Sequence, residues 1–234
     1  MTDIEFLKSK LAKINSYPSI FTEVQCEIPG VGFFPGARGL WNPGDEEISD
    51  KPIMILGHDF GAERDYKLSV ERGNENMTAL TWKNLCKMLD FYGIEKEHCF
   101  FTNAIMGVRS EGSAIGKSPA FEYPDYLNDC KDFLIKQISV QQPKLILVLG
   151  LHLLNFMATM SAELTAISKI KSYKKLDEEK LSSFENISFI GLEGYKTNVV
   201  FITHPTYRHL NIDNRKFGDF KGEQAEFNLI KQFR

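Results

Sequence analysis

Side chains that could do chemistry follow three of the apolar runs of this 234-residue chain. They are Gly57-His58-Asp59-Phe60-Gly61 after the first run, Asn103 at the end of the second, and His204-Pro205-Thr206 after the last. A carboxylate can position water or stabilise positive charge. An amide can read the edge of a base because it donates and accepts, and an imidazole can donate to an oxygen that gains negative charge. Together these groups suit chemistry on a polar, planar ligand.

Each of these residues also has a purely structural explanation. Asp59 could cap a helix, Asn103 could tie a turn, and His204 could pack against Pro205. Their occurrence at successive strand ends favours a site, because ligands of open α/β sheets bind beyond the carboxyl ends of the strands. A metal ion ligated by His58, Asp59 and His204 remains an alternative.

The elements that must position these residues are predicted from the hydrophobic pattern. Short apolar runs without alternation are typical of strands buried on both faces of a parallel sheet. Such runs occur at residues 52–57, 99–103, 144–150 and 199–203. Apolar stripes at helical spacing occur at residues 4–14, 85–92, 130–138, 153–157 and 220–230. This alternation predicts an α/β fold with a mostly parallel sheet covered by helices on both faces.

Two segments are less regular. Residues 29–50 are rich in Gly, Pro and Asp and are predicted to form a loop. Residues 162–198 combine several lysines with acidic residues. We expect a solvated helix or loop there, with a cluster of lysines that contacts phosphate as the alternative. Residues 187–190 could add a short strand.

Composition excludes several classes of protein. The net charge of −3 argues against a protein that coats nucleic acid through bulk positive charge, although a local basic groove remains compatible with it. No apolar run is long enough for a transmembrane helix, and the first residues lack the pattern of a signal peptide. We therefore expect a cytoplasmic protein with no membrane partner.

The cysteines show no metal-binding pattern. Cys26, Cys86, Cys99 and Cys130 form no CxxC pair, so the spacing of a zinc site is absent and buried free thiols are expected. The stretch 57–61 is neither a GxGxxG fingerprint nor a P-loop, and no GxSxG motif of a serine hydrolase occurs.

The order of the motifs resembles that of the uracil-DNA glycosylase superfamily. The first motif of that family follows strand one as GQDPYH, GEAPG or GINPG, and Gly57-His58-Asp59-Phe60-Gly61 stands at that place. The second motif begins His-Pro-Ser after the last strand, where this chain has His-Pro-Thr at 204–206. The iron–sulfur branch has a strand ending in Ile-Thr-Asn, similar to residues 101–103. It also has a Pro-Lys-hydrophobic-Leu-Gly segment, similar to residues 143–150. The resemblance covers about residues 50–215.

This resemblance implies a three-layer α/β/α sandwich around a four-stranded, mostly parallel sheet. We expect a single domain over residues 1–234, with a helix and loop extension at residues 1–50 and a core from about residue 51 onward. DNA containing a modified base is the implied partner, and we expect a monomer.

The resemblance also implies roles for individual residues. Asp59 would orient the attacking water and stabilise an oxocarbenium-like sugar, and His204 would hydrogen-bond the base oxygen as the base departs. Substrate-binding residues would be Gly57, His58, Phe60 and Asn103, with Asn103 reading the Watson–Crick edge and Phe60 or another aromatic stacking on the flipped base. DNA-contacting residues would be Thr206, Tyr207, Arg208 and His209. A basic rim would come from Arg208, Arg215 and Lys216, with Arg64 near the first motif.

The chain also departs from the family pattern. His58 replaces Gln or Glu, Phe60 replaces the proline of the first motif, and Gly61 stands where one branch has a tyrosine that excludes the methyl group of thymine. A selectivity broader than uracil therefore remains open. Cys130 matches one position of the iron–sulfur ligands, but Gly107 stands at another and no N-terminal CxxC occurs, so we predict no cluster, no other cofactor and no metal.

The leading expectation is a glycosidase that hydrolyses the N-glycosidic bond of a deaminated or damaged base in DNA. One alternative is a member of the same fold that binds a nucleobase or nucleic acid without cleaving it. A second alternative is a metal-dependent hydrolase.

Overall fold

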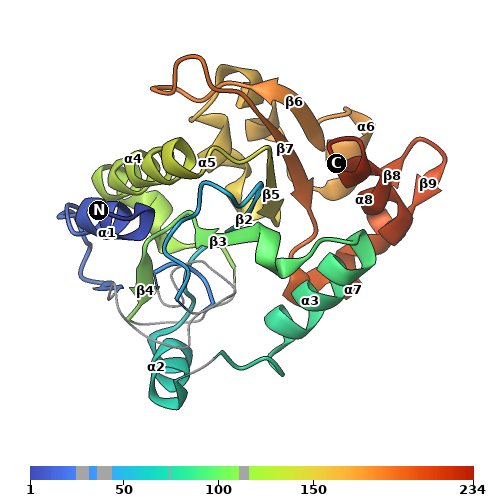
Figure 1. Cartoon of the computed structure of the whole chain (residues 1–234). Helices are drawn as coiled ribbons and strands as arrows, with labels where there is room; N and C mark the ends of the chain where they lie inside the picture. Colours follow the sequence, from blue (N-terminus) through green and yellow to red (C-terminus); the bar gives the residue numbers. More distant parts are fainter. Residues whose placement is uncertain (25–31, 36–43, 74, 111–115) are drawn as a thin grey trace.

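A computed structural model of the chain describes residues 1–24, 32–35, 44–73, 75–110 and 116–234. Helices lie on both sides of a central twisted sheet (Figure 1). Cys26 and parts of the loop predicted at residues 29–50 lie outside the described residues. The described parts of that loop, 32–35 and 44–50, contain neither helix nor strand, as predicted.

The central sheet has five strands in the order β3-β2-β5-β7-β6. The four predicted strands are confirmed as β2 (Ile53–Gly57), β3 (Cys99–Asn103), β5 (Leu145–Leu149) and β7 (Thr197–Ile202), and they run parallel to one another. Their residues are buried on both faces almost throughout, which explains their apolar runs.

The prediction of a four-stranded sheet is wrong by one strand. The fifth strand, β6 (Ser183–Ile187), pairs antiparallel with β7 at the edge of the sheet. The short strand expected at residues 187–190 begins four positions earlier, at Ser183. Most of β6 is half-exposed or exposed, so its polar sequence contains no apolar run. An edge strand pairs with a neighbour on one side only. Because most of β6 is not buried, its residues need not be apolar.

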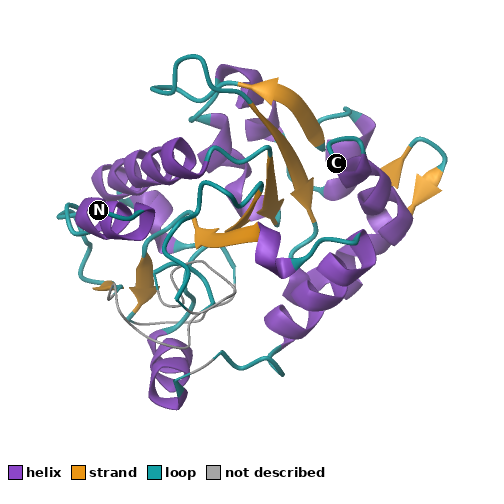
Figure 2. Cartoon of the chain, in the orientation of Figure 1, coloured by secondary structure: helices purple, strands orange, loops and turns teal. Residues whose placement is uncertain are grey.

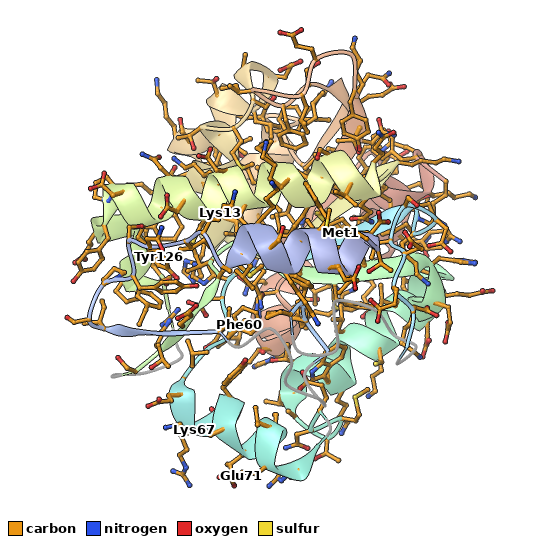
Figure 3. The ribbon with its side chains drawn as sticks, turned by 60° about the vertical axis from the view of Figure 1, so that its left-hand side comes forward. Met1, Lys13, Phe60, Lys67, Glu71 and Tyr126 are labelled. Carbon is orange, nitrogen blue, oxygen red and sulfur yellow. The ribbon has the colours of Figure 1, made fainter. Side chains whose placement is uncertain are left out.

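Helices cover both faces of the sheet (Figures 1 and 2). One face carries α1 (Asp3–Leu11), α4 (Pro124–Gln141) and α5 (Leu154–Ala158), and the other carries α3 (Leu80–Tyr92) and α8 (Gly222–Lys231). Figure 3 shows α1 lying along α4, and residues of the two helices share one hydrophobic cluster. The three-layer α/β/α architecture is therefore confirmed.

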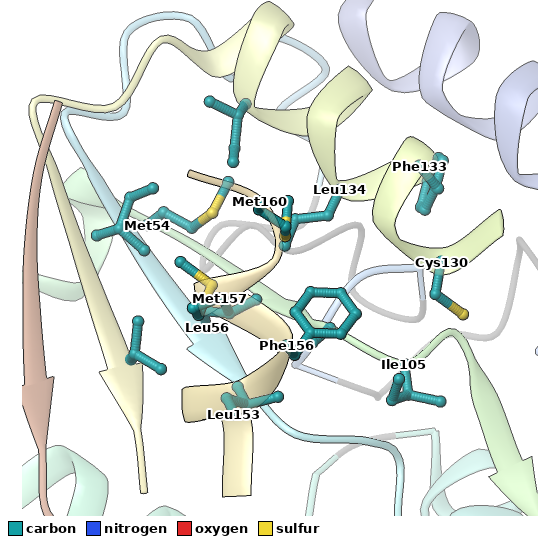
Figure 4. Packing of buried hydrophobic residues seen from close by; sticks show 14 of the residues in the cluster. Met54, Leu56, Ile105, Cys130, Phe133, Leu134, Leu153, Phe156, Met157 and Met160 are labelled. Atoms are coloured by element: carbon teal, nitrogen blue, oxygen red, sulfur yellow. The ribbon is translucent and has the colours of Figure 1, made fainter. Parts of the chain in front are cut away.

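Alternation along the strands divides the core into two clusters. On β2, Met54 and Leu56 face the cluster of α4 and α5, whereas Ile53 and Ile55 face the cluster of α3 and α8. Figure 4 shows Met54 and Leu56 packed near Met157. Because successive side chains of a strand point to opposite faces, one apolar run fills both layers.

The helix ends follow local rules. The side chain of Thr2 caps α1 and Glu5 completes a capping box, while α3 ends at Gly93, whose φ of 65° suits glycine. Phe220 does not belong to the C-terminal helix, contrary to the predicted stripe. It lies in β9 (Phe220–Lys221), which pairs with β8 (Lys216–Phe217) in a hairpin just before α8.

Several elements carry too little periodicity to be predicted. β1 (Phe21–Glu23) pairs with β4 (Gly107–Arg109), and α2 (Glu63–Arg72) has no buried residue and stands at the lower edge of Figure 1. The lysine-rich segment contains α6 (Tyr173–Glu178), where Lys174 and Lys175 pair with Glu178 and Glu179 at the surface. Those pairs agree with a solvated helix. The second motif leads into α7 (Arg208–Asn211).

The cysteines of the described residues are free thiols. Cys99 and Cys130 are buried and Cys86 is half-buried. Among the residues that the structure describes, no helix is long and apolar enough to cross a membrane.

A buried carboxylate fastens α8 to the end of β7. Glu226 is fully buried and accepts hydrogen bonds from the backbone and hydroxyl of Thr203 (2.6 and 3.1 Å) and from the hydroxyl of Tyr92 (2.6 Å). It also pairs with the guanidinium groups of Arg208 and Arg215. Burial alone would raise the pKa of Glu226, but the two guanidinium groups lower it below its ordinary value. The carboxylate therefore holds the backbone immediately before His204.

Removing the Glu226 carboxylate should destabilise the protein severely. Glu226→Ala leaves two buried arginines without their shared partner, and breaking a buried ion pair in this way typically costs about 3–5 kcal/mol. Glu223 is the matched control, since it lies on the same helix and pairs with Arg208 at 3.4 Å but is exposed. Glu223→Ala should change the free energy of unfolding by less than about 1 kcal/mol. Urea denaturation of both variants checks this, and equal losses would contradict the role of Glu226.

Candidate functional site

A cavity of about 1040 Å³ opens at the carboxyl ends of the parallel strands. Gly57 pairs with Asn103, and Leu149 pairs with Ile202, so the four strands end nearly level. Segments that follow every one of these strands line the cavity, and they include residues 57–62, Asn103, residues 150–152 and His204. Parallel register thus brings the predicted carboxylate, amide and imidazole to one hollow.

Asn103 and Phe33 lie together beside Gly57, at the end of β2. A Cβ atom at Gly57 would overlap the Oδ1 of Asn103 and come within 3.1 Å of the ring of Phe33, so glycine is required there by close approach. Phe33 packs against Trp82 and Phe101 at centroid distances of 5.4 and 5.8 Å. The site therefore offers a planar ring beside a buried amide.

Phe33 escaped prediction because it lies in a Gly- and Pro-rich loop without a motif. Phe60, which was predicted to stack on the base, also lines the cavity, but its ring packs edge-on against Tyr66 of α2 at 5.7 Å. Figure 3 shows Phe60 above the helix that carries Lys67 and Glu71. Of the two rings, Phe33 is the one beside Asn103.

His204 is held as a neutral hydrogen-bond donor. Its Nδ1 accepts the backbone N–H of Thr206 at 3.3 Å, so the ring proton belongs on Nε2. Burial lowers the pKa of His204 to about 4; the positive charge of His152 adds to this and Asp59 opposes it. Gly150 lies behind the ring with a φ of 90°, and a Cβ there would come within 3.2 Å of the Cβ of His204.

Asp59 is paired rather than free. Its Oδ2 accepts the Nε and Nη2 of Arg109 at 2.8 and 2.7 Å, and its Oδ1 accepts the backbone N–H of Gly61 at 3.0 Å. Both side chains are about 5% exposed. Arg109 lies on β4, and sequence reasoning missed it because it stands 50 residues from Asp59. Oδ1 of Asp59 therefore still has one lone pair that can accept a hydrogen bond from another donor.

His58 lies within a row of rings. It stacks on Phe121 at 5.8 Å and on His152 at 5.5 Å, and its Nε2 lies 3.4 Å from the backbone N–H of Ser118. Burial lowers the pKa of His58 to about 4. Asp59 acts in the opposite direction, and the charges of His152, Arg109 and His204 lower the pKa further. The imidazole of His58 is therefore uncharged near neutral pH, and it lines the cavity.

The second motif is anchored on α3. The hydroxyl of Thr206 bonds that of Thr81 at 2.7 Å, and the backbone oxygen of Pro205 accepts the amide of Asn84 at 2.9 Å. Tyr207 packs against His204 with ring centroids 5.8 Å apart, whereas His209 is exposed. These contacts fix the loop that follows β7.

The structure places Arg208 inside the protein, not on the surface where a contact with DNA was predicted. Arg208 is only 7% exposed, and its Nη1 donates to Thr203 and Glu226 inside the protein. Arg215 cannot contribute to a basic rim either, because it is 1% exposed and pairs with Asp177 and Glu226. Acidic partners distant in sequence draw both arginines inward. Other cations line the cavity, namely Arg72, Lys117 and Lys171.

Within the described ranges, no group of three or more His, Cys, Asp or Glu side chains is arranged to hold a metal ion. Asp59, which the metal alternative requires, has Arg109 as its partner. The arrangement offers hydrogen bonding and ring stacking.

The pKa of His58 predicts a specific loss of stability in acid. In the unfolded chain His58 has its ordinary pKa of 6.5, whereas in the folded protein its pKa is about 4. Between these two pH values the unfolded state therefore binds more protons than the folded state. The free energy of unfolding consequently falls as the pH drops from 6.5 toward about 4. At about pH 5 this group alone should cost about 2 kcal/mol relative to neutral pH. His58→Phe keeps the ring but cannot titrate. Its free energy of unfolding in urea should fall by about 2 kcal/mol less than that of wild type between these pH values. An identical fall in both proteins would contradict the buried, neutral imidazole.

One family model matches the part of the chain that contains the site segments. The model of the uracil DNA glycosylase superfamily matches residues 43–224, which include all four parallel strands and the segments that follow them. A comparison with curated proteins found no similar sequence. The match extends over more than half of the chain and agrees with the layered fold. The chain therefore belongs to the uracil DNA glycosylase superfamily.

Proposed function

We propose that this protein hydrolyses the N-glycosidic bond of a deaminated or damaged base, uracil or a related base, in DNA. Membership of the superfamily supports a DNA glycosylase-like function. The observation that carries the proposal is the neutral His204, whose remaining donor, Nε2–H, belongs to the same cavity as the buried amide of Asn103 and the ring of Phe33.

These groups suit a base that has been rotated out of the DNA stack. Asn103 would hydrogen-bond the Watson–Crick edge, and Phe33 would stack on the face of the base. As the bond between C1′ and the base nitrogen breaks, negative charge grows on a base oxygen, and Nε2–H of His204 would donate to it. The hydroxyl of a water adds to C1′, and the proton of that water ends on the released base.

Asp59 would serve mainly as an electrostatic and positioning group. Its pairing with Arg109 neutralises part of its charge, but the free lone pair of Oδ1 can still accept a hydrogen from water. A carboxylate held in this way has a fixed orientation, which favours a water placed near the sugar.

The rest of the cavity suits the DNA strand around the flipped base. The side chains of Arg72, Lys117 and Lys171 line it and could meet phosphates without a large net positive charge. Leu210 also lines it and is 64% exposed, which would suit a wedge against neighbouring bases.

Binding without cleavage is the second candidate, and the Asp59–Arg109 pair favours it. A carboxylate that is already neutralised stabilises positive charge on a sugar less than a free one. Such a protein would hold a modified base through Asn103 and Phe33 without releasing it.

Release of free base from oligonucleotides tests the proposed function. Single- and double-stranded oligonucleotides containing uracil, hypoxanthine or xanthine are incubated with the purified protein, and the free base is measured by chromatography. We expect release from at least one of them. His204→Ala should lower kcat about 100-fold or more, because one preorganised donor is typically worth about 3 kcal/mol. His98→Ala, which changes an exposed histidine away from the cavity, is the matched control. No release from any substrate would exclude the glycosylase and leave the binding protein.

Asp59 can be tested separately from its structural pairing. Asp59→Asn removes the negative charge that pairs with buried Arg109, so stability is expected to fall. The double variant Asp59→Asn with Arg109→Gln removes both charges and should regain much of that stability. If Asp59 acts on water or sugar, kcat stays low in the double variant although its melting temperature recovers. Recovery of kcat together with stability would show that Asp59 acts only as the partner of Arg109.

A further inference from the structure

His58 and His152 line the cavity, and Phe121 stacks on His58 next to it. Phe121, from the 3₁₀ turn Pro119–Glu122, packs on His58 at 5.8 Å with an interplanar angle of 26°. His152, after β5, also stacks with His58, at 5.5 Å and 25°. Lys117 Nζ lies 4.7 Å from the centre of the Phe121 ring.

The outer end of the row is open. His152 lines the cavity and is exposed, whereas His58 is mostly buried. His58 stacks on one face of the His152 ring, so a planar ligand would meet the opposite face. A row of parallel rings that ends in an open flat face is a surface on which another planar group can stack.

Cations line the cavity as well. Lys117 and Lys171 line the same cavity as His152. A planar group linked to an anion is therefore the ligand that matches this part of the wall, and a nucleotide has both features. The cavity of about 1040 Å³ also extends beyond what one base would fill between Asn103, Phe33 and His204.

We propose that His152 is a stacking shelf for the nucleobase next to the flipped nucleotide. This inference rests on the proposed function and names its substrate class. A neighbouring base can stack on His152 only after leaving its own stack, which costs least in single-stranded or locally unpaired DNA. The preferred substrate is therefore single-stranded DNA that carries a base on the nucleotide beside the target.

Binding of short single-stranded oligonucleotides tests the shelf without requiring catalysis. Both probes carry a tetrahydrofuran abasic residue at the target position. The first has thymidines on either side, and the second has tetrahydrofuran spacers there as well. Fluorescence anisotropy measures the affinity of each probe for the full chain. Wild type should bind the first probe roughly 10-fold or more tightly than the second, because stacking on an aromatic side chain is of that size.

Three variants make the result specific to the ring. His152→Ala should bind both probes equally weakly, whereas His152→Phe, which restores a flat ring, should keep the preference. His98→Ala, an exposed histidine outside the cavity, should behave as wild type. Thermal melting confirms that each variant is folded. Equal affinity of wild type for the two probes, or an undiminished preference in His152→Ala, would overturn the proposal.

The two proposals fail in different ways. If wild type prefers the first probe but releases no base from any modified oligonucleotide, the glycosylase activity is wrong and the shelf stands. If base is released but the thymidine neighbours affect wild type and His152→Ala equally, the shelf is wrong and the activity stands.

Discussion

The in-register parallel pairing of four buried strands is the constraint on which the site depends. Gly57 lies opposite Asn103, and the backbone N–H of Gly150 donates to the carbonyl of Ile202 at 2.9 Å. Segments that are distant in sequence therefore leave the sheet at one level. Parallel strands require helical crossovers on both faces, and those helices bury the strands completely. The apolar runs, the two core clusters and the shared cavity are consequences of this one arrangement.

Pairing of buried charge fixes the loops beyond the strands. Asp59 is held by Arg109 from a separate small sheet, and the backbone before His204 is held by Glu226 from α8. Each charge lies where water is scarce, so a missing partner would leave the other group at high cost. The same exclusion of water lowers the pKa of both His58 and His204. Rigid loops and neutral imidazoles thus have a common physical origin, and both suit a site that binds a neutral planar base.

Sequence reasoning succeeded where burial alone sets the residue type. The four parallel strands were predicted because full burial demands apolar side chains, and Asn103 and His204 stand at or directly after the ends of two of these strands. β6 was missed because an edge strand has no such demand. Arg109, Phe33 and His152 were not predicted because their roles depend on contacts with residues far along the chain. Arg208 was predicted to contact DNA for the same reason, because the residues around Arg208 do not reveal that it pairs with Glu226.

The tautomer and charge of His204 provide the most direct test of this account. Long-range ¹H–¹⁵N NMR spectra of the labelled protein, assigned with His204→Gln, report which ring nitrogen carries the proton. The account predicts a neutral ring protonated on Nε2 that stays neutral as the pH falls from 6.5 until it approaches about 4. A ring protonated on Nδ1, or a titration with the ordinary pKa of histidine, would contradict it.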